Sequence, residues 1–208
     1  MTTVGLGLAG KAAARRRATW LLWLALLWNT VEGAVAVGSG VVAGSVALIG
    51  FGLDSSIEVM AAGIPLWRLG PHEDDEAAEK KEATAHRVVG ATFLVLAAYI
   101  GAQVVYTLVA SNEPSESRVG FILSVISLIV MPGLGLVKRR NAQNLGSRAL
   151  IAESTETLVC SYLSLALFIG LGANAAFGWW WADIGAALAM VPWIVKEGME
   201  GLRAESCD

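Results

Sequence analysis

Long apolar stretches alternate with short polar segments along the whole chain. A helix that crosses a hydrocarbon layer about 30 Å thick needs roughly 20 residues, most of them apolar. Six stretches reach that length, at residues 18–38, 46–69, 88–110, 119–137, 149–171 and 179–197. The pattern predicts an all-α, polytopic membrane protein. Its six transmembrane helices form one domain over residues 18–197, between terminal tails at residues 1–17 and 198–208.

The composition supports this class. Of the 208 residues, 55 % are hydrophobic and 16 % are charged, and the mean hydropathy is +0.60. Soluble domains carry about 25 % charged residues, so this chain has too few to cover a surface that faces water. A soluble enzyme and a disordered chain are both excluded. The two cysteines, Cys160 and Cys207, are too few for a disulfide framework.

The lysines and arginines predict the orientation. All of them except Arg118 lie before the first span, in or beside the connections at residues 70–87 and 138–148, or at the end of the last span. Basic residues concentrate on the cytoplasmic side of a membrane protein. We therefore expect both termini in the cytoplasm and the chain in the inner cell membrane, with the lipid bilayer as its surroundings. Topology accounts for the basic residues, so no nucleic-acid binding is expected.

Two segments of the chain have an alternative interpretation. Arg15–Arg17, the apolar residues after them and Ala34–Ala36 together imitate a secretory signal with its cleavage site; cleavage would leave five spans without improving the charge asymmetry. The connection at residues 70–87 contains His72 and His86 among many charges. It is expected to be a solvated loop, and a metal-collecting loop is the alternative.

Acidic residues inside the predicted spans are the main functional signal. A carboxylate at mid-depth costs about 2.5–3.5 kcal/mol on insertion scales and usually marks an ion or proton route. Asp54 and Glu58 are four residues apart, as are Glu156 and Cys160, so each pair shares one helix face. Two such helices can face each other and offer four anionic ligands to one zinc-like ion. Each ligand must lose its proton to bind metal, which couples metal to protons.

Other polar residues in the spans are weaker candidates for metal ligands. They are Asn29, Glu32, Glu153 and Asp183. Asn29 and Glu32 can instead connect helices through hydrogen bonds. Glu153 is expected to form a salt bridge with Arg148 near the cytoplasmic end, and Asp183 to cap the last span, whose N-terminus favours an anion. Neutral packing contacts remain the alternative explanation for every carboxylate in the spans.

Three segments of the chain resemble the cation diffusion facilitator family. At the second span, Gly44-Ser45 precedes Asp54 and Glu58 at the spacing of the family's second helix, and the match to that pattern contains no gap. In the fifth span residues 147–149 and 152–153 precede Glu156 and Cys160 at the family's spacing, and Ala182-Asp183 resembles the opening of its sixth helix. The resemblance implies six helices, usually a homodimer, and export of divalent metal in exchange for protons.

The chain departs from the family's pattern at four points. Glu156 replaces the usual histidine, Cys160 replaces the usual aspartate, and Glu58 is a longer acid than the usual one. Loss of the imidazole argues against zinc, whereas a thiolate favours zinc or cadmium over magnesium. Family members usually carry a cytoplasmic domain that holds the dimer together, but only the short tail follows the last span here. We therefore expect a homodimer formed by the membrane helices.

The sequence thus predicts a secondary active transporter that exports a divalent cation, zinc above all, with cadmium, manganese, iron and cobalt as other candidates. Protons are the expected coupling ion, and no resident cofactor is expected. A different class stays open: a regulatory or partner subunit that keeps the fold but does not transport. An intramembrane enzyme is not supported, because no Ser/His pair or HExxH motif lies within a span.

Overall fold

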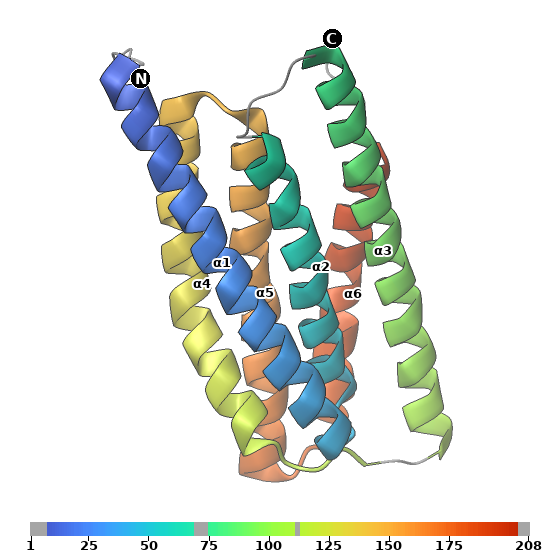
Figure 1. Ribbon diagram of the computed structural model, residues 1–208. Helices are drawn as coiled ribbons and strands as arrows, with labels where there is room; N and C mark the ends of the chain where they lie inside the picture. The colour runs from blue at the N-terminus through green and yellow to red at the C-terminus, as the bar shows by residue number, and fades with distance from the viewer. Residues whose placement is uncertain (1–7, 69–74, 111–112, 204–208) are drawn as a thin grey trace.

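The computed structural model describes residues 8–68, 75–110 and 113–203, and all of their regular secondary structure is α-helical. The helices are α1 (Leu8–Ala43), α2 (Val46–Arg68), α3 (Asp75–Ala110), α4 (Arg118–Leu145), α5 (Arg148–Phe177) and α6 (Trp181–Leu202). They run up and down in one bundle (Figure 1), and the described ends of the chain lie at the same end of it. That end also carries the basic connections, as an even number of spans requires.

Several helices are longer than the apolar stretches that predicted them. The prediction of a loop over residues 70–87 was wrong from Asp75 onward, because α3 begins there, and residues 138–145 belong to α4 rather than to a connection. These extensions are rich in strong helix formers. The extension of α3 also contains ion pairs between residues one turn apart, such as Lys80 Nζ to Glu76 Oε1 at 2.7 Å. His72 lies outside the described residues.

Five helices, α1 to α5, are long and apolar enough to cross a membrane by length and composition. The sixth, α6, carries Asp183 near its start and Lys196, Glu197 and Glu200 near its end, which lowers its hydropathy. It nevertheless runs beside α3 and packs against α2, α3 and α5. The bundle therefore shelters part of its polar surface.

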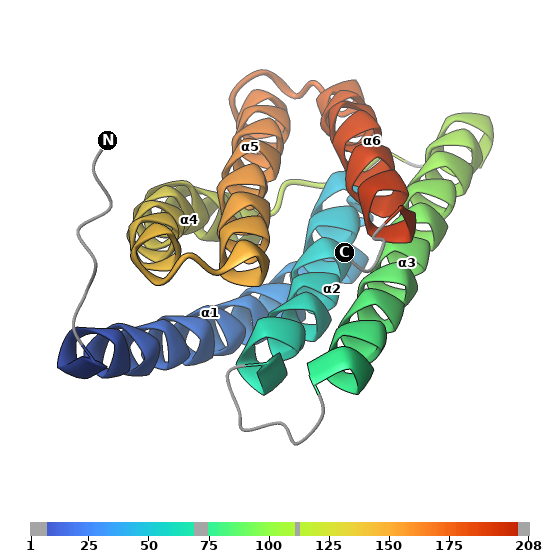
Figure 2. The ribbon, with the colours of Figure 1, turned by 90° about the horizontal axis from the view of Figure 1, so that it is seen from above.

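The helices associate as three closely packed pairs, α1 with α2, α4 with α5, and α3 with α6. Figure 2, seen along the bundle, shows α2 between α1 and α3, with α5 and α6 on its other side. α2 also contacts both α5 and α6 directly. Large side chains such as Phe51, Ile100, Leu167 and Met190 fill the core and are fully buried. This arrangement places the polar faces of α2 and α5 against each other.

The turn between α1 and α2 is fixed by a carboxylate of α6. Gly44 adopts the left-handed conformation (φ 68°) that glycine tolerates best, and the Ser45 hydroxyl accepts a hydrogen bond from the Leu48 N–H at 3.0 Å. Asp183 in turn accepts hydrogen bonds from the Ser45 hydroxyl at 2.5 Å and the Val46 N–H at 2.9 Å. The expectation that Asp183 caps its own helix was wrong. It caps the N-terminus of α2, whose exposed N–H groups favour an anion.

Glycines allow α3 and α6 to approach each other at backbone distance. A Cβ atom added at Gly90 would lie 2.7 Å from the Gly198 carbonyl oxygen and 2.8 Å from the Leu202 nitrogen. Helix interfaces in membranes use small residues in this way, because closer backbones gain van der Waals contact. At Gly101, on the same helix, an added Cβ would meet nothing within 4 Å.

We predict that Gly90→Ala lowers the free energy of unfolding by about 1–3 kcal/mol, since the backbone atoms it would meet cannot rotate away. Gly101→Ala is the matched control and should leave stability unchanged or raise it by up to about 1 kcal/mol. Reversible unfolding in detergent micelles measures both. Equal stability of the two variants would contradict the close packing of α3 on α6.

Candidate metal centre

Two helices bring three potential metal ligands together near the middle of the bundle. Asp54 and Glu58 on α2 and Cys160 on α5 each offer one ligand atom, and these atoms all lie within 4.8 Å of one another. All three residues are buried, with exposed fractions of 3 %, 7 % and 0 %. We call this group the inner cluster. Zinc ligands lie about 2.0–2.3 Å from the ion, so small side-chain rotations would suffice to surround one ion.

The fourth predicted ligand, Glu156, is not part of the inner cluster. It is partly buried. Together with Asp54 and Glu58 it lines a cavity, and the space not filled by atoms there is about 240 Å³, open solvent included. Asp54 and Glu156 therefore face the same space from α2 and α5. The structure thus joins three of the four candidates directly and places the fourth beside them.

Asp54 has an oxygen that no group in the described residues satisfies. Its Oδ2 atom is buried and has no hydrogen-bond partner. Burying a polar atom in this way is costly unless something compensates it. Because Asp54 also lines the cavity, a cation or a proton bound there would provide the compensation. The donor set of two carboxylates and one thiol fits a divalent metal ion by its chemistry.

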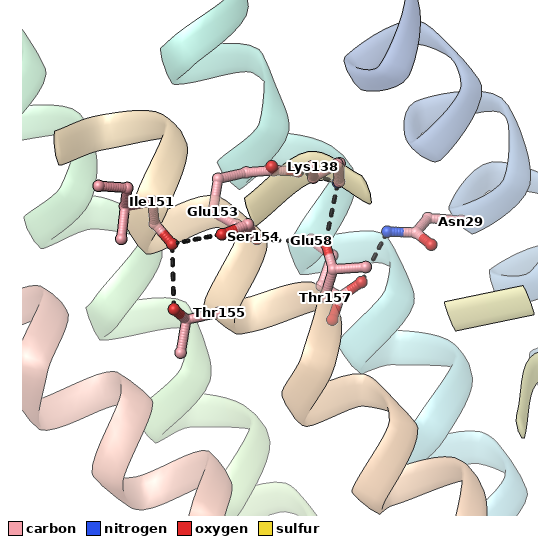
Figure 3. A network of polar contacts seen from close by, with 8 residues as sticks. All are labelled: Asn29, Glu58, Lys138, Ile151, Glu153, Ser154, Thr155 and Thr157. Carbon is pink, nitrogen blue, oxygen red and sulfur yellow. Dashed lines mark hydrogen bonds and ion pairs between the residues drawn. The ribbon is translucent and has the colours of Figure 1, made fainter. Parts of the chain in front are cut away.

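Asn29 of α1 holds one of the three ligands. Its side-chain amide donates a hydrogen bond of 2.6 Å to Glu58 Oε2, and Figure 3 shows this contact. Asn29 is itself buried, at 3 % exposure. The amide therefore fixes the direction of the Glu58 carboxylate, and its place in the structure is beside a candidate ligand rather than within the inner cluster.

Glu32 is buried and fully engaged with protein groups. It accepts hydrogen bonds from the hydroxyls of Ser127 on α4 and Ser55 on α2, the latter at 3.0 Å, and from the Trp28 indole at 3.3 Å. Glu32 lies outside the inner cluster. Its contacts connect α1, α2 and α4, which is the helix-connecting role that the sequence left open for it.

Glu153 pairs with a lysine that the sequence placed in a polar connection. Lys138 of α4 is buried, and its ammonium donates hydrogen bonds to Glu153 Oε1 and, at 2.8 Å, to the hydroxyl of Thr157 (Figure 3). The placement of Lys138 in a loop was therefore wrong. A salt bridge between Glu153 and Arg148 was expected, but the side chain of Arg148 lies outside the described part of the chain.

The sequence contains a signal for this buried lysine. Ser127, Met131, Leu134 and Lys138 follow one another at helical spacing, and all four are buried. Continuing the apolar face of α4 past its last apolar residue would have placed Lys138 on the same face. Around the ion pair, the hydroxyls of Ser154 and Thr155 only donate to the Ile151 carbonyl of their own helix, at 2.7 and 3.0 Å (Figure 3).

The relation to known proteins agrees with this arrangement. The family model of the cation efflux transmembrane domain matches residues 79–205, which is more than half of the chain. The chain belongs to the cation efflux family. The matched segment includes α4, α5 and α6, with Glu156 and Cys160, whereas Asp54 and Glu58 precede it. The resemblance to the cation diffusion facilitators is thereby confirmed.

One curated relative is Transmembrane protein 163 of Xenopus laevis, whose name gives no substrate. The two sequences are 26 % identical over 155 residues, which cover 74 % of this chain and 55 % of the relative. The chain thus spans about half the length of that protein. Membership of the cation efflux family makes this a multi-pass membrane protein.

The buried ion pair between α4 and α5 gives a testable consequence. Lys138→Met should lower the free energy of unfolding by about 3–5 kcal/mol, because it leaves Glu153 buried without its cation. The double variant Lys138→Met/Glu153→Gln should recover most of that loss, since no isolated charge remains. Unfolding in detergent micelles measures each variant.

Lys196→Met is the control for this experiment. Lys196 pairs with Glu200 across 3.7 Å on the exposed side of α6, and such pairs contribute less than about 1 kcal/mol. A double variant as unstable as the single one would show that the lysine acts through packing and not through its charge.

Proposed function

We propose that this chain carries a zinc-like divalent cation across the inner cell membrane in exchange for protons. Asp54, Glu58 and Cys160 bind the ion, and Glu156 supplies a fourth donor from the adjoining cavity wall. The observation that carries the proposal is the convergence of three buried ligand atoms within 4.8 Å, from two helices of a cation efflux bundle.

The donor set favours particular metals. A thiolate selects softer ions such as zinc and cadmium, and carboxylates alone would suit magnesium, calcium or manganese. The inner cluster combines both kinds of donor. Zinc and cadmium are therefore the preferred substrates, and manganese, iron and cobalt, which tolerate oxygen donors, come second.

The same residues provide the coupling to protons. A thiol or carboxyl group binds metal in its deprotonated form, so metal and protons compete for one set of atoms. In an apolar bundle the inner cluster would carry protons when it has released the metal. Alternating access of this cluster to the two sides then exchanges metal for protons.

Direction and assembly follow from the ends of the bundle. Apart from Arg118, the basic residues are placed at the end that carries both described termini, which makes that end cytoplasmic by the distribution of positive charge. Metal is taken up there and released on the opposite side. A homodimer formed by the membrane helices completes the proposal.

The decisive test is metal flux in proteoliposomes with an imposed pH gradient. Wild type should transport zinc and cadmium, and Asp54→Asn should reduce flux to the level of empty vesicles, because the amide cannot act as an anionic ligand. Glu200→Gln on the exposed side of α6 should transport like wild type. Wild-type vesicles that move none of zinc, cadmium, manganese, iron or cobalt would favour the non-transporting subunit instead.

A second variant tests the choice of metal. Cys160→Ser replaces the soft donor with a hard one, so the ratio of cadmium to manganese transport should fall by about tenfold or more, within the range that changes around metal sites produce. Cys207→Ser removes the other cysteine of the chain and serves as the control. An unchanged ratio in Cys160→Ser would exclude a thiolate ligand.

A further inference from the structure

The cavity beside the inner cluster has an acidic residue from a third helix in its wall. Glu197 of α6 lines this cavity together with Glu156, Asp54 and Glu58. Both Glu156 and Glu197 are partly exposed, whereas Asp54 and Glu58 are buried. Neither the family's usual ligand positions nor the spacing of acids in the spans singled out Glu197, which stands at the edge of the last predicted span.

The acids of the cavity lie at graded depths. Glu197 lies roughly one and a half turns before α6 ends at Leu202, and Glu156 roughly two turns after α5 begins at Arg148. Cys160 lies one turn deeper than Glu156 on α5, and Asp54 roughly four turns from the end of α2 at Arg68. All of these helix ends are on the side that carries the termini (Figure 1). The carboxylates therefore lead inward from that side.

The two outer carboxylates are not neutralised by a neighbouring cation. In the described parts of the chain, neither Glu156 nor Glu197 forms a salt bridge. The nearest lysine in sequence, Lys196, is directed elsewhere: its ammonium lies 3.7 Å from Glu200 and 4.2 Å above the centre of the Trp193 ring. Both carboxylates are thus available to a cation from outside.

A buried atom without a hydrogen-bond partner also belongs to a residue that lines this cavity. The Oδ2 atom of Asp54, which is 3 % exposed, lacks a hydrogen-bond partner. Asp54 lines the cavity at its inner side. The remaining wall is largely apolar, with Phe93, Leu163 and Ile194, which strengthens the attraction between the acids and a cation.

We propose that Glu156 and Glu197 form a loading site, where a divalent cation is captured from the side of the termini before it reaches the inner cluster. Glu156 belongs to both positions: it binds the ion with Glu197 of α6, then turns toward Cys160 and Asp54 and delivers it. This inference rests on the proposed function for the fate of the ion, but the capture of the ion can be measured without transport.

The experiment measures the rate at which Zn²⁺ associates with the purified full chain in detergent. Stopped-flow mixing with a fluorescent zinc chelator as competitor gives this rate for wild type, Glu197→Gln and Glu200→Gln. Glu200 is the matched control because it lies one turn away on the exposed side of α6. Loss of Glu197 should slow association about three- to tenfold at low salt and weaken its dependence on ionic strength, since acids lining a cleft raise on-rates by attracting cations. Glu200→Gln should behave like wild type.

A second measurement connects capture to flux. In proteoliposomes, Glu197→Gln should raise the half-saturating Zn²⁺ concentration about three- to tenfold on the side of the termini, while the maximal rate stays within about twofold of wild type. Replacing an inner ligand such as Asp54 should instead abolish the flux. This division separates a loading residue from a residue of the inner cluster and from a variant that has lost its fold.

The outcomes separate the two proposals. Association and half-saturation in Glu197→Gln equal to those of Glu200→Gln would overturn the loading site and leave the transporter in place. Slower association in Glu197→Gln, in a protein that shows no flux, would support the loading site and remove the transport function. A wild-type protein that binds no Zn²⁺ would overturn both.

Discussion

The cost of burying several acids in an apolar bundle governs this structure. Asp54 and Glu58 approach each other and Cys160 with almost no exposed surface, and close anions in such surroundings repel each other strongly. Nothing in the packing of an ordinary helix bundle requires such a group. A compensating positive charge, supplied by protons or by a metal ion, makes the arrangement tolerable, and that requirement links the fold to its proposed chemistry.

The contrast between the buried acids shows which of them are structural. Glu32 accepts three hydrogen bonds and Glu153 has the ammonium of Lys138, so protein groups meet most of their needs. Among the described residues, Asp54 and Glu153 each keep one buried oxygen without a hydrogen-bond partner, but of the two only Glu153 has a cation, Lys138, beside its other oxygen. Burial alone would not have distinguished these residues, because all of them are almost inaccessible. What distinguishes them is whether the surrounding helices supply donors.

Helical periodicity predicted which candidate side chains of α2 and of α5 share a helix face. Asp54 and Glu58, and likewise Glu156 and Cys160, were expected to share helix faces, and the structure puts α2 against α5. The ends of the helices could not be predicted from hydropathy, since a helix such as α3 continues from lipid into water without a change in its backbone. The partner of Asp183 was equally hidden, because it depends on a contact between helices distant in sequence.

The contact between Asp183 and the N-terminus of α2 has a consequence for movement. Several hydrogen bonds from Ser45 and the first N–H groups of α2 end on one side chain of α6, at the end opposite the termini. Separating these two helices there would expose all of those donors at once. We therefore expect α2 and α6 to tilt together about this point as a shared pivot, so that the largest displacements occur at the far end, which carries the termini.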